Sequence, residues 1–322
     1  MKKALITGGT GQDGAYLARH LLKRGYAVTV STRRRNPGNE VNLSALGIAA
    51  QVAFVELDPC CRDHVSDCVE EGGFTEIYHL SGQSSVGFSF EDPAGTAESI
   101  TQSTQNVLET VRRKSPDTRV FIAGSGEMYG DTGGEPVHEG MLPNPVNPYA
   151  CAKAAAYFMT RSYRTCFGIH ACTGILFNHE SPLRPDRYVT RKIVKTACRI
   201  AKGQEKELVL GNIGVARDWG WAPEFVEAMH VMLQQEAAAD YVIATGQVQK
   251  LSDFVSDVFS ALGLDWRKHT KTGSSNLRPT DVPILYGRPS AIARDLGWKA
   301  RTLAPDVARK MVRFEMQENG EG

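Results

Sequence analysis

The segment Lys3-Ala-Leu-Ile-Thr7-Gly8-Gly-Thr-Gly-Gln-Asp-Gly14 decides how this chain folds. Residues 3–7 have the apolar pattern of a short buried strand, and Tyr16, Leu17 and Leu21 follow the glycines at helical spacing. A strand, a glycine turn and a helix in this order can hold the pyrophosphate of a dinucleotide, because glycines let the backbone approach the phosphates and the helix start offers free N–H groups. We predict such a site rather than an ordinary glycine turn. Its expected contacts are Gly8, Gly11, Gln12, Asp13 and Gly14.

Strand-like runs continue along the first half of the chain. They alternate with helical segments of ten or more residues, which predicts an α/β fold with a parallel, doubly wound sheet. Ligands of such sheets bind at the carboxyl ends of the strands. Further strands are expected at 26–31, 51–55, 76–80, 118–124 and 171–176, and long helices at 94–113 and from 149 to about 166.

The alternation breaks after residue 178, which divides the chain into two predicted units. The first is a Rossmann-type, dinucleotide-binding unit of residues 1–178, joined by about 215–240. The second is a smaller, discontinuous C-terminal substrate lobe of 179–214 and 241–322, which ends in a tail expected to fray. Within and between these segments, helices are expected near 189–203, 222–235, 250–262 and 304–317.

Arginines follow the second predicted strand, where a site for NAD has an acidic residue instead. The run is Thr32-Arg-Arg-Arg35. Guanidinium groups suit a 2′-phosphate by charge and by paired hydrogen bonds, so we predict NADP as the cofactor, with Arg33 and Arg34 among its contacts. A solvated basic loop is the alternative. Asp58, at the end of the third strand, is expected near the adenine.

Four side chains with complementary chemistry follow the fifth predicted strand. Ser125 and Glu127 come just after it, and Tyr149 and Lys153 are four residues apart, so they share one face of a helix. An ammonium group beside a phenol lowers the phenol pKa, so we expect Tyr149 to act as a general acid/base on an alcohol that becomes a ketone. Taken alone, a Tyr-x-x-x-Lys pair is more often an ordinary helix surface.

Composition limits the possible partners. A net charge of +1 and a charged fraction of 23% create no general field for nucleic acid or a membrane surface. We find no signal-peptide pattern and no apolar run of transmembrane length. Seven cysteines without Cys-x-x-Cys spacing predict free thiols in a reducing cytoplasm, and eight histidines without a His-x-x-x-His pair predict no metal site.

These motifs together resemble the extended short-chain dehydrogenase/reductase superfamily. Longer segments are similar to the GDP-mannose 4,6-dehydratase family over nearly the whole chain, and the Phe-Asn-His-Glu-Ser-Pro run is rather specific to that family and its neighbours. The similar segments are Thr7-Gly-Gly-Thr-Gly-Gln-Asp-Gly14, Gly174-Ile-Leu-Phe-Asn-His-Glu-Ser-Pro182, Val189-Thr-Arg-Lys-Ile193, Arg217-Asp-Trp-Gly220, Val242-Ile-Ala-Thr-Gly246 and Leu296-Gly-Trp-Lys299.

The resemblance implies a reaction without net oxidation. Tyr149 would take the proton of the sugar 4-hydroxyl while hydride passes from C4 to NADP⁺, with Ser125 bonded to the 4-oxygen and Lys153 holding the phenolate and the nicotinamide ribose. Glu127 would then remove the C5 proton, water would leave from C6, and the hydride would return to C6. The product would be GDP-4-keto-6-deoxymannose.

The resemblance also implies binding residues, although a structural salt bridge remains an alternative for each charged one. Those expected at the cofactor include Leu80, Gln83, Tyr149, Lys153, His179 and Arg184. Those expected at the GDP-sugar are Ser85, Asn178, Lys192, Gly211, Arg217, Arg278 and Asp281.

Several positions depart from the family pattern. Gly126 stands where the family usually has Ser, which removes a side chain beside the reacting sugar. Residues 99–104 replace an acidic and glycine-containing wall of the site, and Gly95 replaces a common tyrosine. The loop 36–41 lacks the Ser-rich arm that helps related enzymes form tetramers. We therefore expect a dimer at least, formed by helices 94–113 and 149–167, without an obligatory tetramer.

Three alternatives remain open. Another GDP-sugar, such as a GDP-heptose, is possible within the same reaction. A 4-keto-sugar reductase or epimerase shares the fold, and Glu127 discriminates because a simple reductase needs no C5 base. A non-enzymatic NADP-sensing or scaffold protein would need none of the four catalytic side chains.

Overall fold

A seven-stranded parallel sheet forms the centre of the first unit. The computed structural model of the chain describes residues 1–34, 37–273 and 280–318. The strand order is β11-β6-β5-β4-β1-β2-β3, and each neighbouring pair is parallel, which confirms the doubly wound sheet. The strands are β1 (Lys3–Thr7), β2 (Ala27–Thr32), β3 (Ala53–Glu56), β4 (Glu76–His79), β5 (Arg119–Ala123), β6 (Ala171–Leu176) and β11 (Tyr241–Ile243).

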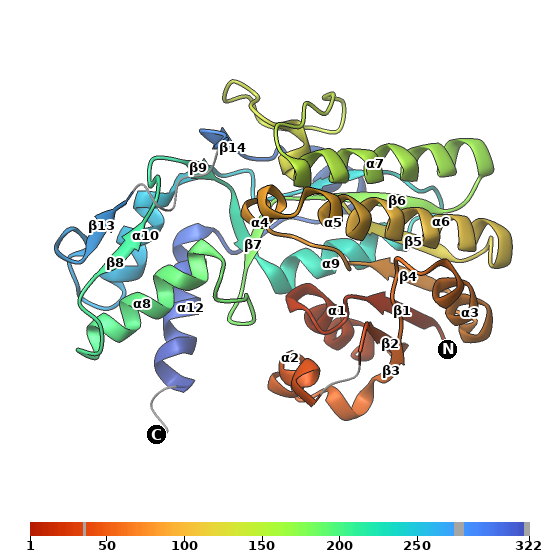
Figure 1. The fold of residues 1–322 in the computed structure, drawn as a ribbon, viewed down its shortest axis with the longest axis horizontal. Coiled ribbons are helices and arrows are strands. Elements are labelled where there is room, and N and C mark those ends of the chain that lie inside the picture. The colour runs from red at the N-terminus through yellow and green to blue at the C-terminus, as the bar shows by residue number, and fades with distance from the viewer. Residues whose placement is uncertain (35–36, 274–279, 319–322) are drawn as a thin grey trace.

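Helices cover both faces of this sheet (Figure 1). Side chains alternate along a strand, so Ala4 and Ile6 pack with α1 and α9 on one face while Leu5 packs with α3 and α6 on the other. All three residues are at most 1% exposed, as expected of a parallel strand buried on both faces. The covering helices are α1 (Gln12–Leu22), α3 (Arg62–Gly72), α6 (Ser103–Lys114), α7 (Pro148–Phe167) and α9 (Ala222–Leu233), with the shorter α2 (Val41–Ala45) beside α1.

The glycine turn after β1 requires residues without a side chain. Gly8 has φ +70°, and the N–H of Gly11 donates to its carbonyl at 3.0 Å. A Cβ on Gly14 would lie 2.5 Å from the Gly8 oxygen and from the Gly9 Cα. The start of α1 is therefore packed directly against the turn, as a dinucleotide site needs.

The predicted helix over 94–113 is helical but not regular. It consists of α5 (Pro93–Ala97), a π-helical turn (Glu98–Gln102) and α6, with α4 (Val86–Glu91) before it. The Ser103 hydroxyl donates to the carbonyl of Ser99 at 2.6 Å inside this wide turn. The turn brings Ser99 and Ser103 to the wall of the main cleft.

The second unit has its own apolar core. Helices α8 (Val189–Ala201), α10 (Leu251–Ser260) and α12 (Ala304–Glu318) pack on one another and lie to the left of the sheet in Figure 1. Their buried side chains form one cluster with Leu208, Leu210 and Trp219. Beside them β8 (Leu208–Leu210) pairs with β13 (Thr270–Thr272).

Short strands connect the two units. They are β7 (Asn178–Glu180) with β10 (Trp219–Trp221), and β9 (Ala216–Arg217) between β12 (Gln249–Lys250) and β14 (Ile284–Leu285). The predicted boundary at 241 differs from the packing, because β11 extends the central sheet beside β6. Trp298, just after α11 (Ser290–Leu296), likewise packs in the cluster of α1 and α9.

No helix among residues 1–34, 37–273 and 280–318 is long and apolar enough to cross a membrane. The seven cysteines, all within those ranges, carry free thiols. The tail predicted to fray lies, from residue 319, outside the described residues.

Candidate active site

The four predicted catalytic side chains line one cleft of about 1740 Å³ at the carboxyl ends of the sheet strands. Ser125 follows β5 and caps a 3₁₀ turn (Gly126–Tyr129), where its hydroxyl accepts the N–H of Glu127 at 3.2 Å. Tyr149 and Lys153 lie on the first turns of α7, whose start is fixed by the Asn147 side chain accepting the Ala150 N–H at 2.8 Å. Sequence spacing predicted this grouping.

The electrostatics of the pair on α7 differ from our expectation. The Lys153 Nζ donates to the Ala123 carbonyl at 2.7 Å and lies 5.8 Å from the centre of the Tyr149 ring. Burial lowers the pKa of Lys153 to about 8, against the opposing effect of Asp13. Burial raises the pKa of the Tyr149 phenol above its usual value, and the interaction with Ser125 offsets this only in part. The phenol pKa in the protein alone is thus raised rather than lowered, contrary to our prediction, because burial is the largest influence on it.

Asp13 links the glycine turn to the opposite wall of the cleft. Its Oδ2 lies 2.9 Å from Nε2 of His179, and Gln12 bonds both Asp13 and the His179 carbonyl. Burial opposes charge on both partners, yet their attraction lowers the pKa of Asp13 and raises that of His179. His179 also stacks on Phe225, with ring centres 4.6 Å apart.

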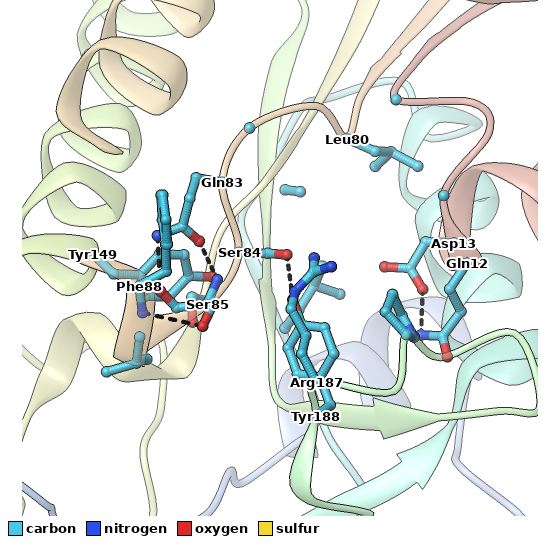
Figure 2. Close-up of a pocket in the computed structure, with 18 of the residues that line it drawn as sticks. Gln12, Asp13, Leu80, Gln83, Ser84, Ser85, Phe88, Tyr149, Arg187 and Tyr188 are labelled. Carbon is cyan, nitrogen blue, oxygen red and sulfur yellow. Dashed lines mark hydrogen bonds between the residues drawn. The ribbon is translucent and has the colours of Figure 1, made fainter. Parts of the chain in front are cut away.

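A contact across the cleft was missing from our sequence prediction. The hydroxyls of Ser84, after β4, and Tyr188, before α8, are 2.6 Å apart. The Tyr188 ring lies 3.8 Å from the guanidinium of Arg184 and 5.0 Å from that of Arg187. Figure 2 shows this contact between Tyr149 on one side and Asp13 on the other. We name it the Ser84–Tyr188 bridge; its only sequence signal is an arginine-rich loop with an aromatic residue.

The far end of the cleft is lined by Arg33, Arg34 and Asp58, the predicted contacts of the adenosine half of the cofactor. Arg35 lies outside the described residues. Asp58 accepts the N–H of Cys60 at 3.1 Å, which orders the loop after β3. Both arginines are exposed, so their side chains can reach a bound dinucleotide.

Most of the other predicted binding residues also line the cleft. On the cofactor side these are Gly8, Gly11, Gly14, Leu80, Gln83 and Arg184, and on the substrate side Ser85, Asn178, Lys192, Gly211, Arg217 and Asp281. Gln83 bonds Ser85 and Thr96 through its amide, so it shapes the loop before α4. Arg278 lies outside the described residues.

Comparison with known proteins identifies the family of this chain. A family model described as GDP-mannose 4,6 dehydratase matches residues 5–311. GDP-mannose 4,6 dehydratase 1 of Arabidopsis thaliana is 38% identical to this chain over 98% of the chain and 90% of its own length. The chain belongs to the GDP-mannose 4,6-dehydratase family. This confirms the resemblance drawn from the segments quoted above.

Solved structures similar to this family member show how widely its fold is shared. A dTDP-glucose 4,6-dehydratase from Streptomyces venezuelae, with NAD bound, has a TM-score of 0.87 at 22% identity and covers 99% of this chain and 98% of its own. A UDP-glucose 4-epimerase from Thermus thermophilus, also with NAD, has a TM-score of 0.84 at 24% identity and covers 97% and 98%. At these identities the likeness concerns the fold alone.

One departure from the family pattern has a packing reason. We expected Gly126 to leave space beside the reacting sugar. A Cβ at this position would instead lie 2.6 Å from the Phe177 ring, so the aromatic side chain already fills that space. Phe177 is 5% exposed and lines the cleft. In this member of the dehydratase family, Phe177 forms the wall where the missing side chain would stand.

The Asp13–His179 pair predicts a pH response. Because the folded pKa of His179 lies above its usual value of 6.5, the contribution of protonated His179 to stability is fully present below pH 6.5 and is lost as pH rises through the folded pKa. The contribution of ionised Asp13, whose folded pKa is lowered, is lost only as pH falls through that lower pKa. Asp13→Asn should lower the pKa of His179 below 6.5, since burial and Arg184 remain. An NMR titration of the imidazole measures this.

His79 is the internal control in that titration. Burial and Lys153 lower its pKa to about 3, and its ring contacts the hydroxyls of Thr7 and Ser103. Its signals should stay unchanged between pH 5 and 8 in both proteins. A His179 pKa that is the same with and without the Asp13 carboxylate would contradict the pairing.

Proposed function

We propose that this chain is a nucleotide-sugar 4,6-dehydratase that converts GDP-mannose to GDP-4-keto-6-deoxymannose and water with NADP. The observation that carries the proposal is Glu127 in the same cleft as Ser125, Tyr149 and Lys153. A simple reductase needs an acid/base for the 4-hydroxyl but none for C5. Membership of the dehydratase family supports the same reading.

The cofactor site fits a nicotinamide dinucleotide. The turn around Gly8 and Gly14 leaves no room for side chains and opens on the start of α1, where backbone N–H groups can bind a pyrophosphate. When bound, the cofactor would supply an acceptor for the C4 hydride and its return to C6. Arg33 and Arg34 would hold its 2′-phosphate.

The protein's own residues would move the protons. Ser125 donates a hydrogen bond to the sugar 4-oxygen, and Tyr149 takes the proton of the 4-hydroxyl as the ketone forms. Lys153, buried and with a pKa near 8, holds a positive charge beside the phenol and bonds the nicotinamide ribose. The ketone acidifies the C5 proton, and Glu127 removes it and passes it to the 6-hydroxyl, which leaves C6 as water. A proton then returns to C5 as hydride adds at C6.

The two units divide the binding. The sheet unit would hold the cofactor, together with His179 and Arg184 at the boundary. The second unit would cover the GDP portion through Lys192 and Gly211, whereas Asn178, Arg217 and Asp281 lie on or beside the short connecting strands. Ser85, at the start of α4, would face the sugar from the sheet side. Seven free thiols are consistent with a cytoplasmic setting.

NADP should bind more tightly than NAD. Replacing Arg33 by Ser should remove a charged contact to the 2′-phosphate and weaken NADP by ~1.5–3 kcal/mol while leaving NAD unchanged. Titration calorimetry with both dinucleotides measures the difference. Lys23→Ser, at the opposite end of α1, is the matched control and should bind both as the parent does. Equal affinities of the parent for NAD and NADP would contradict the assignment.

Glu127→Gln separates dehydration from simple redox chemistry. The variant should bind NADP and GDP-mannose but lose turnover by roughly 10²–10⁴, the usual contribution of a positioned acid/base. It should accumulate NADPH with a 4-keto sugar that keeps its 6-hydroxyl, whereas Tyr149→Phe should give no NADPH signal. Single-turnover NADPH absorbance, paired with mass detection of water loss, measures both steps.

These measurements test the role of Glu127 and choose between the candidate functions. If Glu127→Gln loses water at the parent rate, the assignment of Glu127 as the C5 base fails. A parent protein that forms NADPH or a reduced sugar but releases no water from any GDP-sugar would instead put the reductase or epimerase reading first. Mass spectrometry of a panel of GDP-sugars with the parent protein then identifies the sugar, with GDP-mannose expected and a GDP-heptose as the rival.

We also propose a homodimer built on the outer face of α7. Phe158 on this helix is 47% exposed, which is apolar surface that a partner would bury. Light scattering should give twice the chain mass, and Phe158→Ser should shift it toward the monomer. Val248→Ser, at a 44% exposed position away from α7, should not. A parent protein that is monomeric, or tetrameric at high dilution, would rule the proposal out.

A further inference from the structure

Arg217 is held between two carboxylates in the cleft. Its Nε lies 3.9 Å from Oε1 of Glu127, and its Nη2 lies 3.4 Å from Oδ1 of Asp281. Its Nη1 donates to the carbonyls of Ala216 at 2.9 Å and Val282 at 2.8 Å. The guanidinium thus spans from the expected base to the side of the cleft expected to hold the nucleotide.

The backbone makes this guanidinium rigid. Arg217 belongs to β9, which pairs with β12 on one side and with β14 on the other. Its side chain is only 8% exposed, and it donates two hydrogen bonds to main-chain carbonyls, whose positions are fixed by the backbone in and next to the strands. Glu127, by contrast, lies on a short 3₁₀ turn after Ser125. Of the two partners, the arginine is therefore the fixed one.

The separation of the pair suits a base. At 3.9 Å the contact is longer than a hydrogen bond, so the charges attract without tying a carboxylate lone pair to a donor. The ion pair can therefore fix where the Glu127 carboxylate points while leaving an oxygen able to accept a proton. If Arg217 only bound the nucleotide, its Nε would not need to face Glu127.

We propose that Arg217 is a positioning residue for Glu127, in addition to any contact with the nucleotide diphosphate. This inference rests on the proposed function, since it assigns Arg217 a role in the C5–C6 elimination and none in oxidation at C4. Asp281 serves as the second carboxylate that keeps the guanidinium in plane. A misdirected base slows only the step that uses it, and small displacements of a catalytic group can cost about 10²-fold.

The test compares the two steps in Arg217→Lys at saturating GDP-mannose. NADPH formation in a single turnover should stay within about 3-fold of the parent, whereas water loss should slow by roughly 10–10²-fold, so that NADPH accumulates. Lys192→Gln is the matched control, because Lys192 lines the same cleft but bonds the Val209 carbonyl at 2.8 Å. It should raise KM without separating the two rates.

A double variant tests whether Arg217 acts through Glu127. In the Glu127→Gln background, adding Arg217→Lys should not slow water loss further, because the base is already absent. Arg217→Met repeats the comparison if the lysine variant is not folded by circular dichroism and NADP binding. Three results would overturn the inference: equal slowing of both steps, a change in KM alone, or full additivity of Arg217→Lys with Glu127→Gln. None of them would overturn the proposed dehydratase function, which the assay of water release by the parent protein tests separately.

Discussion

The contact between Gly14 and the Gly8–Gly9 backbone is the constraint on which the rest of the site depends. A Cβ on Gly14 would lie 2.5 Å from both the Gly8 oxygen and the Gly9 Cα, and one on Gly8 would lie 2.9 Å from the Ser81 N. The end of β1, the start of α1 and the loop after β4 therefore meet without side chains between them. Asp13 then emerges from the first turn of α1 and reaches His179 beside the short connecting strands. This close approach of the backbone therefore positions both the glycine turn, where we expect the pyrophosphate, and the contact between Asp13 and His179.

Local pattern predicted the parts of the molecule that are local. β1 and β6 have the bounds expected from their apolar runs, and Tyr149 and Lys153 share a helix face because their spacing requires it. The Ser84–Tyr188 bridge joins residues 104 positions apart, which no pattern within one segment reveals. β11 escaped prediction for the same reason, since three residues become a strand only when β6 offers an open edge.

The Tyr149 prediction failed for a different reason. Spacing places an ammonium near a phenol, but it does not say how deeply both are buried or where the ammonium points. Here Lys153 bonds the Ala123 carbonyl, and burial raises the pKa of Tyr149. Gly126 is a similar case. The sequence shows only that this residue has no side chain, whereas the structure shows that the Phe177 ring occupies the space beside it. The pKa values and the shape of a site depend on how deeply its side chains are buried and how they are oriented, and these follow only from the packed structure.

The second unit is assembled from distant parts of the chain, and this limits the order in which the molecule can form during synthesis. Its core joins Ile193 and Val194 to Leu251, and closes only on Val307 and Met311 near the end of the chain. The central sheet in turn waits for β11, made after α8. A nascent chain therefore cannot complete the second core until α12 has been synthesised, and the apolar face of α8 stays incompletely covered until then. The cleft can therefore form only after the late segments of both units have been synthesised, and not by one unit folding completely before the other.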